Sequence, residues 1–134
     1  MEYKLIIDGV AELSEEIEEV TFISKIPPDS NARSSNLQAG LTIKGRISFM
    51  EDKVFMKDNM QKIAQWSLVK PAMVDSYKTA TLEYMHGGAP RKYEFSHAFI
   101  ISYTESFGAK GGTDGTFELV LKQKEDRIDD VVLS

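Results

Sequence analysis

The chain has 134 residues, of which 42% are hydrophobic and 28% charged, with a formal net charge of -5 and no cysteine. This size predicts one soluble globular domain over residues 1–134, since such a chain buries roughly two-thirds of its surface without help from a disulfide or a metal. The lack of cysteine excludes thiol catalysis and thiolate metal sites. The acidic balance, with lysine and arginine scattered along the chain, disfavours nucleic acid as a partner.

No targeting or membrane segment is indicated. The first residues, MEYKLIIDGVAEL, lack a basic region followed by an apolar run, so we expect no signal peptide. The uninterrupted apolar runs are far shorter than the roughly 20 residues that span a bilayer, so we expect no membrane insertion. The protein is therefore expected to be made in the cytoplasm and, if it leaves the cell, to leave through other machinery.

Two strands and a polar loop are predicted in the first 40 residues. Strands at 2–7 and 18–26 are joined by DGVAELSEE, in which Asp8-Gly9 is a turn signal. Residues 26–40 then form an extended loop, rich in proline and serine, without an apolar period. Such a loop suits contact with a neighbouring molecule better than support of a core. Its candidate contact residues are Pro27, Pro28, Asp29, Ser30, Asn31, Arg33, Ser34, Ser35 and Asn36.

The clearest predicted strand is LTIKGRISF, residues 41–49, because apolar and polar residues alternate along it. The face expected to meet the core carries Leu41, Ile43, Ile47 and Phe49. The face expected to be wet carries Thr42, Lys44, Arg46 and Ser48.

One short amphipathic helix is predicted at residues 54–68, VFMKDNMQKIAQWSL, since apolar residues recur at helical spacing and no glycine or proline interrupts them. It is expected to end before Pro71 and to pack on the flank of a barrel or sandwich. The residues expected to make this packing are Met56, Met60, Ile63 and Trp66.

The second half of the chain holds the remaining predicted strands. Segments 77–86 and 115–124 each have one apolar face, and HGGAPRK joins the first of them to a short strand near 91–95. The segment HAFIISYTESF, which ends at Phe107, has few charges on either face and is expected to be covered on both sides. The tail at 125–134 is expected to be flexible or to extend the last strand.

No catalytic, cofactor or metal site is predicted. His86 and His97 have neither a cysteine nor a Glu-x-x-His context, which favours structural roles. The loop GAKGGTDG offers Asp114 as one carboxylate where calcium takes about six to eight oxygens, so a plain hairpin loop is the simpler interpretation. The glutamates of residues 12–19 are most simply a solvated face.

The order of these pieces resembles the Hcp family, the tube proteins of type VI secretion systems, and the related inner-tube proteins of contractile phage tails and injection systems. The resemblance covers nearly the whole chain through YKLIIDGV, PPDSNARSSNLQAG, LTIKGRISF, MKDNMQKIAQWSL, YKTATLEYM, KYEFSHAFIISYTESFG and GTFELVLKQKED. The acidic stretch AELSEEIEE and the charged tail depart from the pattern. They leave open a type VI system, a phage-derived bacteriocin or an extracellular injection particle.

The resemblance implies a mainly β fold, a small barrel or sandwich of two packed antiparallel sheets with one short flanking α-helix. It also implies that copies form hexameric rings that stack into a hollow tube, with sheath, spike and baseplate proteins as partners and effectors as candidate cargo. In that arrangement the loop around Arg33 would join stacked rings. The residues expected to face the lumen are Thr42, Lys44, Arg46 and Ser48.

A rival hypothesis from another class is a monomeric β-sandwich binding module or small hydrolase with a groove beside Trp66, Tyr77 or His97. An intermediate hypothesis is a secreted effector that borrows the tube fold. The structural subunit without enzyme activity is the leading interpretation, because no residue pattern supports catalysis.

Overall fold

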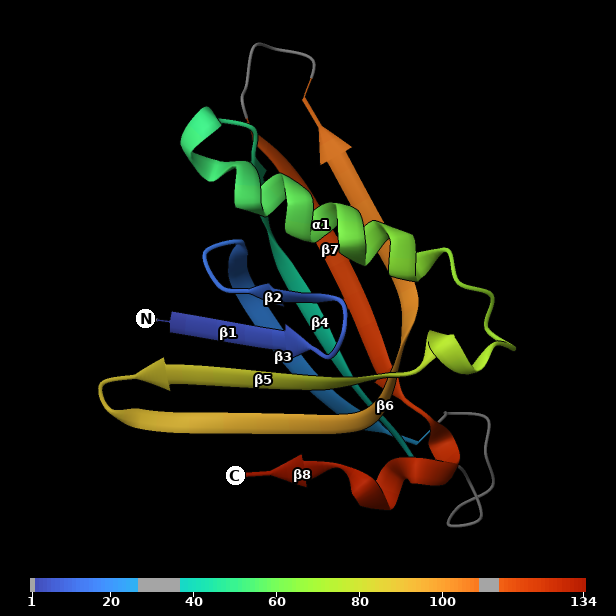
Figure 1. The fold of residues 1–134 in the computed structure, drawn as a ribbon. Helices are drawn as coiled ribbons and strands as arrows, with labels where there is room; N and C mark the ends of the chain where they lie inside the picture. Colours follow the sequence, from blue (N-terminus) through green and yellow to red (C-terminus); the bar gives the residue numbers. More distant parts are fainter. Residues whose placement is uncertain (1, 27–36, 109–113) are drawn as a thin grey trace.

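The computed structural model describes residues 2–26, 37–108 and 114–134. These residues form eight strands, one α-helix and three short 3₁₀ helices (Figure 1). The strands are β1 (Glu2–Ile7), β2 (Ala11–Leu13), β3 (Ile17–Lys25), β4 (Gln38–Ser48), β5 (Lys78–His86), β6 (Ala89–Phe107), β7 (Asp114–Gln123) and β8 (Val132–Leu133). The helices are η2 (Glu51–Lys53), α1 (Val54–Ser67), η3 (Val74–Ser76) and η4 (Glu125–Asp130).

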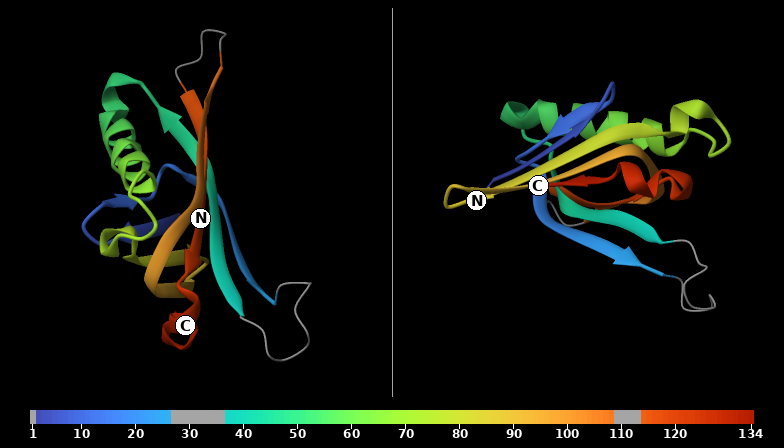
Figure 2. Two further views of the ribbon diagram at one scale, coloured as in Figure 1. Left: turned by 90° about the vertical axis from the view of Figure 1, so that its right-hand side faces the viewer. Right: turned by 90° about the horizontal axis from the view of Figure 1, so that it is seen from below.

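All of these strands belong to one antiparallel sheet in the order β2-β1-β5-β6-β7-β4-β3, with β8 paired to β6. The sheet folds over on itself because β6 is shared: residues 89–98 pair with β5, and residues 98–107 pair with β7. We call β2, β1, β5, β8 and the first half of β6 the first layer, and the second half of β6 with β7, β4 and β3 the second layer (Figures 1 and 2). The predicted mainly β fold with one helix is confirmed, but its two sheets are halves of one continuous sheet.

The hydrophobic core lies between the two layers and under α1, which crosses the second layer (Figure 1). Leu5, Ile43, Phe95 and Leu119, from four different strands, have no exposed surface. The buried residues of α1 are Met56, Met60, Ile63 and Trp66. Because these residues are spaced by three and four positions, they lie along one side of the helix.

The strand β6 and the tail differ from their predictions. Residues 89–107 form one strand rather than two, joined to β5 by a tight turn at Gly87 and Gly88. Both glycines have positive φ, 62° and 83°, which glycine adopts without strain. The tail neither extends β7 nor hangs free, since it forms η4 and then β8, which pairs with β6.

Glu16 is a buried carboxylate, which corrects the prediction that residues 12–19 form a solvated face. Its side chain is 1% exposed and accepts hydrogen bonds from the Ser14 backbone N–H and from the Asn59 amide of α1, both at 2.9 Å. Its carbonyl oxygen accepts the Arg46 backbone N–H at 2.9 Å. Glu16 therefore ties the turn between β2 and β3 to both the helix and the second layer.

This close approach requires glycine at position 45. A Cβ added to Gly45 would overlap the Glu16 carbonyl oxygen and crowd the Phe117 ring. We predict that Gly45→Ala lowers the free energy of unfolding by about 2 kcal/mol or more, measured by urea denaturation. Gly108→Ala is the matched control, because a Cβ there meets nothing within 4 Å. Equal stability of the two variants would contradict this account.

Candidate functional site

One face of the second layer carries no other element among the described residues, and we call it the bare face. The first layer and α1 both pack against the opposite face (Figure 1; Figure 2, left). The side chains of Lys44 and Arg46 on the bare face are 52% and 42% exposed, and Thr42 is half-buried there. Around Lys44 and Arg46 this face is therefore polar and open to solvent in the single chain, whereas Ile23, Ile101 and Thr42 line a shallow hollow of about 200 Å³ on it.

The end of β4 departs from the predicted alternation. Ser48 is 4% exposed, and its hydroxyl accepts a hydrogen bond from the Met50 backbone N–H at 3.3 Å. Phe49, expected in the core, is 46% exposed and packs against the Phe107 ring with centroids 5.5 Å apart. The prediction that Ser48 lies on the wet face is wrong, because β4 ends there and the chain turns into η2.

Charges on the bare face are paired across strands. Lys44 lies opposite Glu19 on one side and Glu118 on the other, and its Nζ is 3.6 Å from the Glu118 carboxylate. Arg46 reaches the Asp114 carboxylate at 3.7 Å. Opposite charges on facing strands stabilise a register modestly, and at this exposure each pair contributes little to folding. The pairing places opposite charges side by side on this face.

The second layer ends on both sides in a strand with a free edge. Within the described residues, β3 pairs with β4 alone, and the second half of β6 pairs with β7 alone. Ile23 on β3 and Ile101 on β6 are 45% and 53% exposed at these two edges. Unpaired backbone groups beside exposed aliphatic residues form a template for pairing with another chain.

The second half of β6 is less covered than its sequence predicts. Ile101 and Phe107 are more than half exposed, so the strand is not covered on both sides within one copy. Tyr103 on this half is partly buried and donates its hydroxyl proton to the Glu105 carboxylate. Burial, and then this hydrogen bond, raises the pKa of Tyr103 well above its usual value, so the hydroxyl stays a donor.

The predicted ring-stacking residues lie outside the described part of the chain. They belong to residues 27–36, between β3 and β4. Their role remains a prediction from sequence.

The rival groove does not bring its three residues together. Tyr77 and His97 line one hollow of about 400 Å³, whereas Trp66 lines another. Trp66 is 5% exposed and donates its indole N–H to the Ser76 carbonyl at 3.0 Å, so it belongs to the core. Of the two residues that share a hollow, His97 is the one whose ring nitrogen contacts a serine hydroxyl, that of Ser96.

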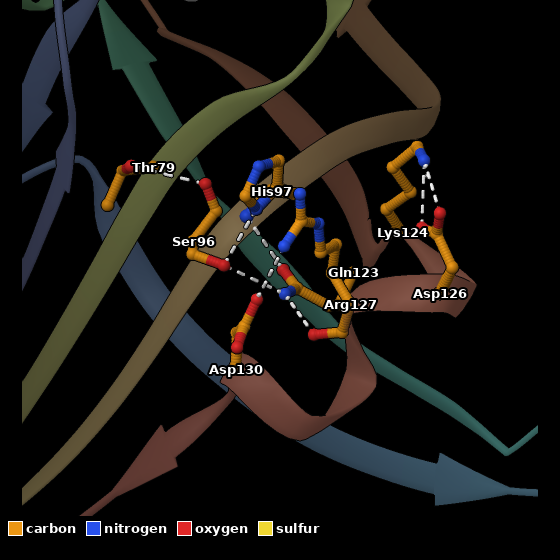
Figure 3. Close-up of polar contacts among 8 residues, drawn as sticks. All are labelled: Thr79, Ser96, His97, Gln123, Lys124, Asp126, Arg127 and Asp130. Carbon is orange, nitrogen blue, oxygen red and sulfur yellow. Dashed lines mark hydrogen bonds and ion pairs between the residues drawn. The ribbon is translucent and has the colours of Figure 1, made fainter.

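His97 contacts Ser96 in a hydrogen-bond network (Figure 3). The pair has the residue types of a catalytic serine–histidine dyad but not its geometry. The Ser96 hydroxyl is 2.8 Å from His97 Nδ1 and also accepts the Gln123 side-chain amide at 3.1 Å. In serine hydrolases the nucleophile contacts Nε2, and an acid orients the other ring nitrogen. Among the described residues no carboxylate lies within ion-pairing distance of His97, so the geometry does not support a nucleophilic serine.

The same network supports the bend in β6. Residues 96 and 97 form a bulge opposite Thr79, where the ladder with β5 is interrupted. The Gln123 side chain accepts the His97 backbone N–H at 2.9 Å and donates to the Arg127 carbonyl at 2.7 Å (Figure 3). Backbone groups that the bulge frees are thereby satisfied, and η4 is held against β6.

The sequence held a signal for Gln123 that the prediction did not use. Inward residues of β7 recur at Phe117, Leu119 and Leu121, and the next inward position is Gln123, which has no exposed surface. A polar residue at a core position indicates a buried hydrogen-bond partner.

The described residues contain no cluster of three or more acidic, histidine or cysteine side chains suited to a metal ion. None of the helices in that part of the chain has the length and apolar character needed to cross a membrane.

No family model matches the chain, and no curated protein matches it. Solved structures do match. A type six secretion system protein has a TM-score of 0.62 at 12% identity, covering 92% of this chain and 79% of that one. Hcp1 from Flavobacterium johnsoniae has a TM-score of 0.58 at 12% identity, covering 92% and 90%. A chain of the sheath-tube complex of PVC, an extracellular contractile injection system, has a TM-score of 0.55 at 15% identity, covering 98% and 87%.

These identities are low, and the likeness therefore concerns the fold. The chain has the Hcp-like fold of tail-tube proteins, which confirms the resemblance found in the sequence. The match runs over nearly the whole chain, so both layers belong to the shared architecture.

A variant at Gln123 tests the structural role of this network. We predict that Gln123→Leu lowers the free energy of unfolding by about 2 kcal/mol, because the His97 N–H and the Arg127 carbonyl lose their partner. Gln65→Leu, on the exposed side of α1, is the matched control and should change stability little. Urea denaturation measures the stability of both variants. A Gln123→Leu variant as stable as wild type would contradict a stabilising role for the network.

Proposed function

We propose that this chain is a structural subunit, without enzyme activity, of the inner tube of a contractile injection machine. Copies assemble into hexameric rings that stack into a hollow tube. The observation that carries the proposal is that, among the described strands, the second layer ends on both sides in a free strand edge. An unpaired strand edge can aggregate with other chains. If both edges of a subunit pair with neighbouring copies, neither edge stays exposed.

The directions of the strands fit such a pairing. β3 runs antiparallel to β4, β4 antiparallel to β7, and β7 antiparallel to β6. The second half of β6 is therefore antiparallel to β3, and the two edges of neighbouring copies would form an ordinary antiparallel ladder. Repetition around a ring closes the second layer of every copy into one cylinder.

In this cylinder the bare face lines the lumen. The supporting observation is that the first layer and α1 occupy the other side, where they keep the bare face clear (Figure 2, left). Thr42, Lys44 and Arg46 would then form a polar wall. Lys44 and Arg46 form cross-strand ion pairs with Glu118 and Asp114, which partly neutralise their charges. The wall would therefore bind passing cargo weakly.

The proposed partners follow from this orientation. α1 and the first layer would face outward toward a sheath, and the fold likeness to a chain of a sheath-tube complex supports that partner. Spike and baseplate proteins would meet the ends of the tube, and residues 27–36, with Arg33, would join successive rings. The subunit would act in a cytoplasmic or released particle, leave the cell on contraction and carry effectors in the lumen.

Assembly of the purified protein tests the proposal. Light scattering after size exclusion, followed by negative-stain microscopy, should reveal rings or tubes whose proportion rises with concentration. A strictly monomeric protein at the highest soluble concentration would favour the monomeric binding module instead.

A substitution at a free edge separates assembly from folding. We predict that Ile101→Lys keeps the thermal midpoint, since the side chain is 53% exposed. It should raise the concentration needed for ring formation by about tenfold, because each interface would bury a charge. Val54→Lys is the matched control, since Val54 is 52% exposed and belongs to α1 rather than to either edge strand. Equal effects of the two substitutions on assembly would contradict pairing at this edge.

A further inference from the structure

Four aromatic side chains gather at the end of the molecule where the β5–β6 hairpin extends past β1. Tyr3 packs on Tyr84, and Phe22 stacks on Tyr93, each pair with ring centroids 5.0 Å apart. Between the two pairs lies an open pocket of about 280 Å³, which we call the aromatic pocket. Its remaining lining residues are Val20, Leu82 and Arg91. One of its walls, Phe22, belongs to β3, a free edge of the second layer.

The aromatic pocket is apolar at its base and carries a cation at its rim. Leu82 is 1% exposed, whereas Arg91 is exposed and lies over the Tyr93 ring, 5.5 Å from its centroid. Burial, with smaller contributions from Tyr84 and Glu19, raises the pKa of Tyr3, so its hydroxyl stays neutral. The pocket therefore suits an aliphatic side chain that has an acidic neighbour.

The opposite end of the molecule carries the complementary group. Residues 68–75, between α1 and β5, form the apolar loop, in which Val74 is 85% and Leu68 is 83% exposed. The loop is held in place from inside, because buried Ser76 donates its hydroxyl to the Pro71 carbonyl at 3.2 Å. Exposed aliphatic side chains on an anchored loop lose little freedom on binding.

The charges at the two ends are complementary. Asp75 follows Val74 directly in the apolar loop, and Arg91 sits on the rim of the aromatic pocket. Neither side chain forms an ion pair within residues 2–26, 37–108 and 114–134.

The two ends are also placed for contact between neighbours. The hairpin lies at one extreme of the molecule and the apolar loop at the other, in two perpendicular views (Figure 1; Figure 2, right). α1 crosses the second layer so that the loop lies beyond β6, while the aromatic pocket includes β3. The loop and the pocket thus lie on the same sides of the molecule as the two free edges.

We propose that the apolar loop of one copy inserts Val74 into the aromatic pocket of the next copy, with Asp75 against Arg91. This contact rests on the proposed ring and adds to it a second, side-chain interface outside the cylinder. Because a loop meets a pocket, the contact is head-to-tail, the type that closes rings.

A charge exchange tests the contact. Asp75→Arg and Arg91→Asp should each raise the concentration for ring formation by about tenfold, and the double variant should restore it to near the wild-type value. Asp58→Arg and Lys57→Asp, on exposed positions of α1, are the matched controls and should assemble like wild type. Normal assembly of both single variants, or a double variant no better than either, would overturn the pairing.

Cysteine cross-linking gives a second readout, because the chain has no cysteine of its own. Under oxidation, a variant with both Asp75→Cys and Arg91→Cys should give a ladder of covalent trimers and larger species, since each copy links to two neighbours. Each single variant can reach only dimers. If the double variant forms rings in the microscope but no ladder of cross-linked species, this contact is overturned and the proposed function stands. If the wild type never assembles, the proposed function itself is contradicted.

Discussion

The side-chain amide of Gln123 holds β6 at the point where that strand leaves one layer and enters the other. It has no exposed surface, and it bonds to the His97 backbone, to the Ser96 hydroxyl and to the Arg127 carbonyl. A buried amide of this kind is stable only when its donors and acceptors are matched, so it fixes one geometry of the bulge. The angle between the layers, the position of η4 and the pairing of β8 all depend on that bend.

The bend also explains why the second layer has two free edges. Because β6 turns away from β5 after Ala98, its second half gains β7 as a neighbour and loses β5. The second layer therefore ends in β6 on one side and β3 on the other, and no strand among the described residues closes either edge. The first layer and α1 supply the apolar surface that stabilises one face, which leaves the other face exposed, with Lys44 and Arg46 on it. The same strand thus contributes both to the core of the single copy and to one free edge of the second layer.

The spacing of apolar residues along the sequence predicted much of this fold. A repeat of two residues in a strand, or of about 3.6 in a helix, indicates which residues face the core. It succeeded for β4 up to Ile47 and for the helix α1. It failed at Ser48 and Phe49, where a strand end and η2 reverse exposure, and at Glu16, where hydrogen bonds from Asn59 and a backbone N–H make burial of a carboxylate tolerable. Local pattern carries no information about such distant partners.

The sequence predicted the polar face of the candidate assembly site, but it did not predict which strand edges are free. The wet face of Thr42, Lys44 and Arg46 followed from sequence, but the free edges depend on which strands pair, and pairing is a long-range property. The aromatic pocket joins Tyr3, Phe22, Tyr84 and Tyr93 from four strands, and no spacing in the sequence indicates their meeting. Residues 27–36 remain a hypothesis from composition.

A cryo-electron microscopy reconstruction of the assembled protein tests the central claim most directly. We expect β3 of each copy to lie beside the second half of β6 of its neighbour in an antiparallel ladder, with Lys44 and Arg46 facing the lumen. Rings in which these two edges face solvent, or in which the bare face points outward, would contradict the account.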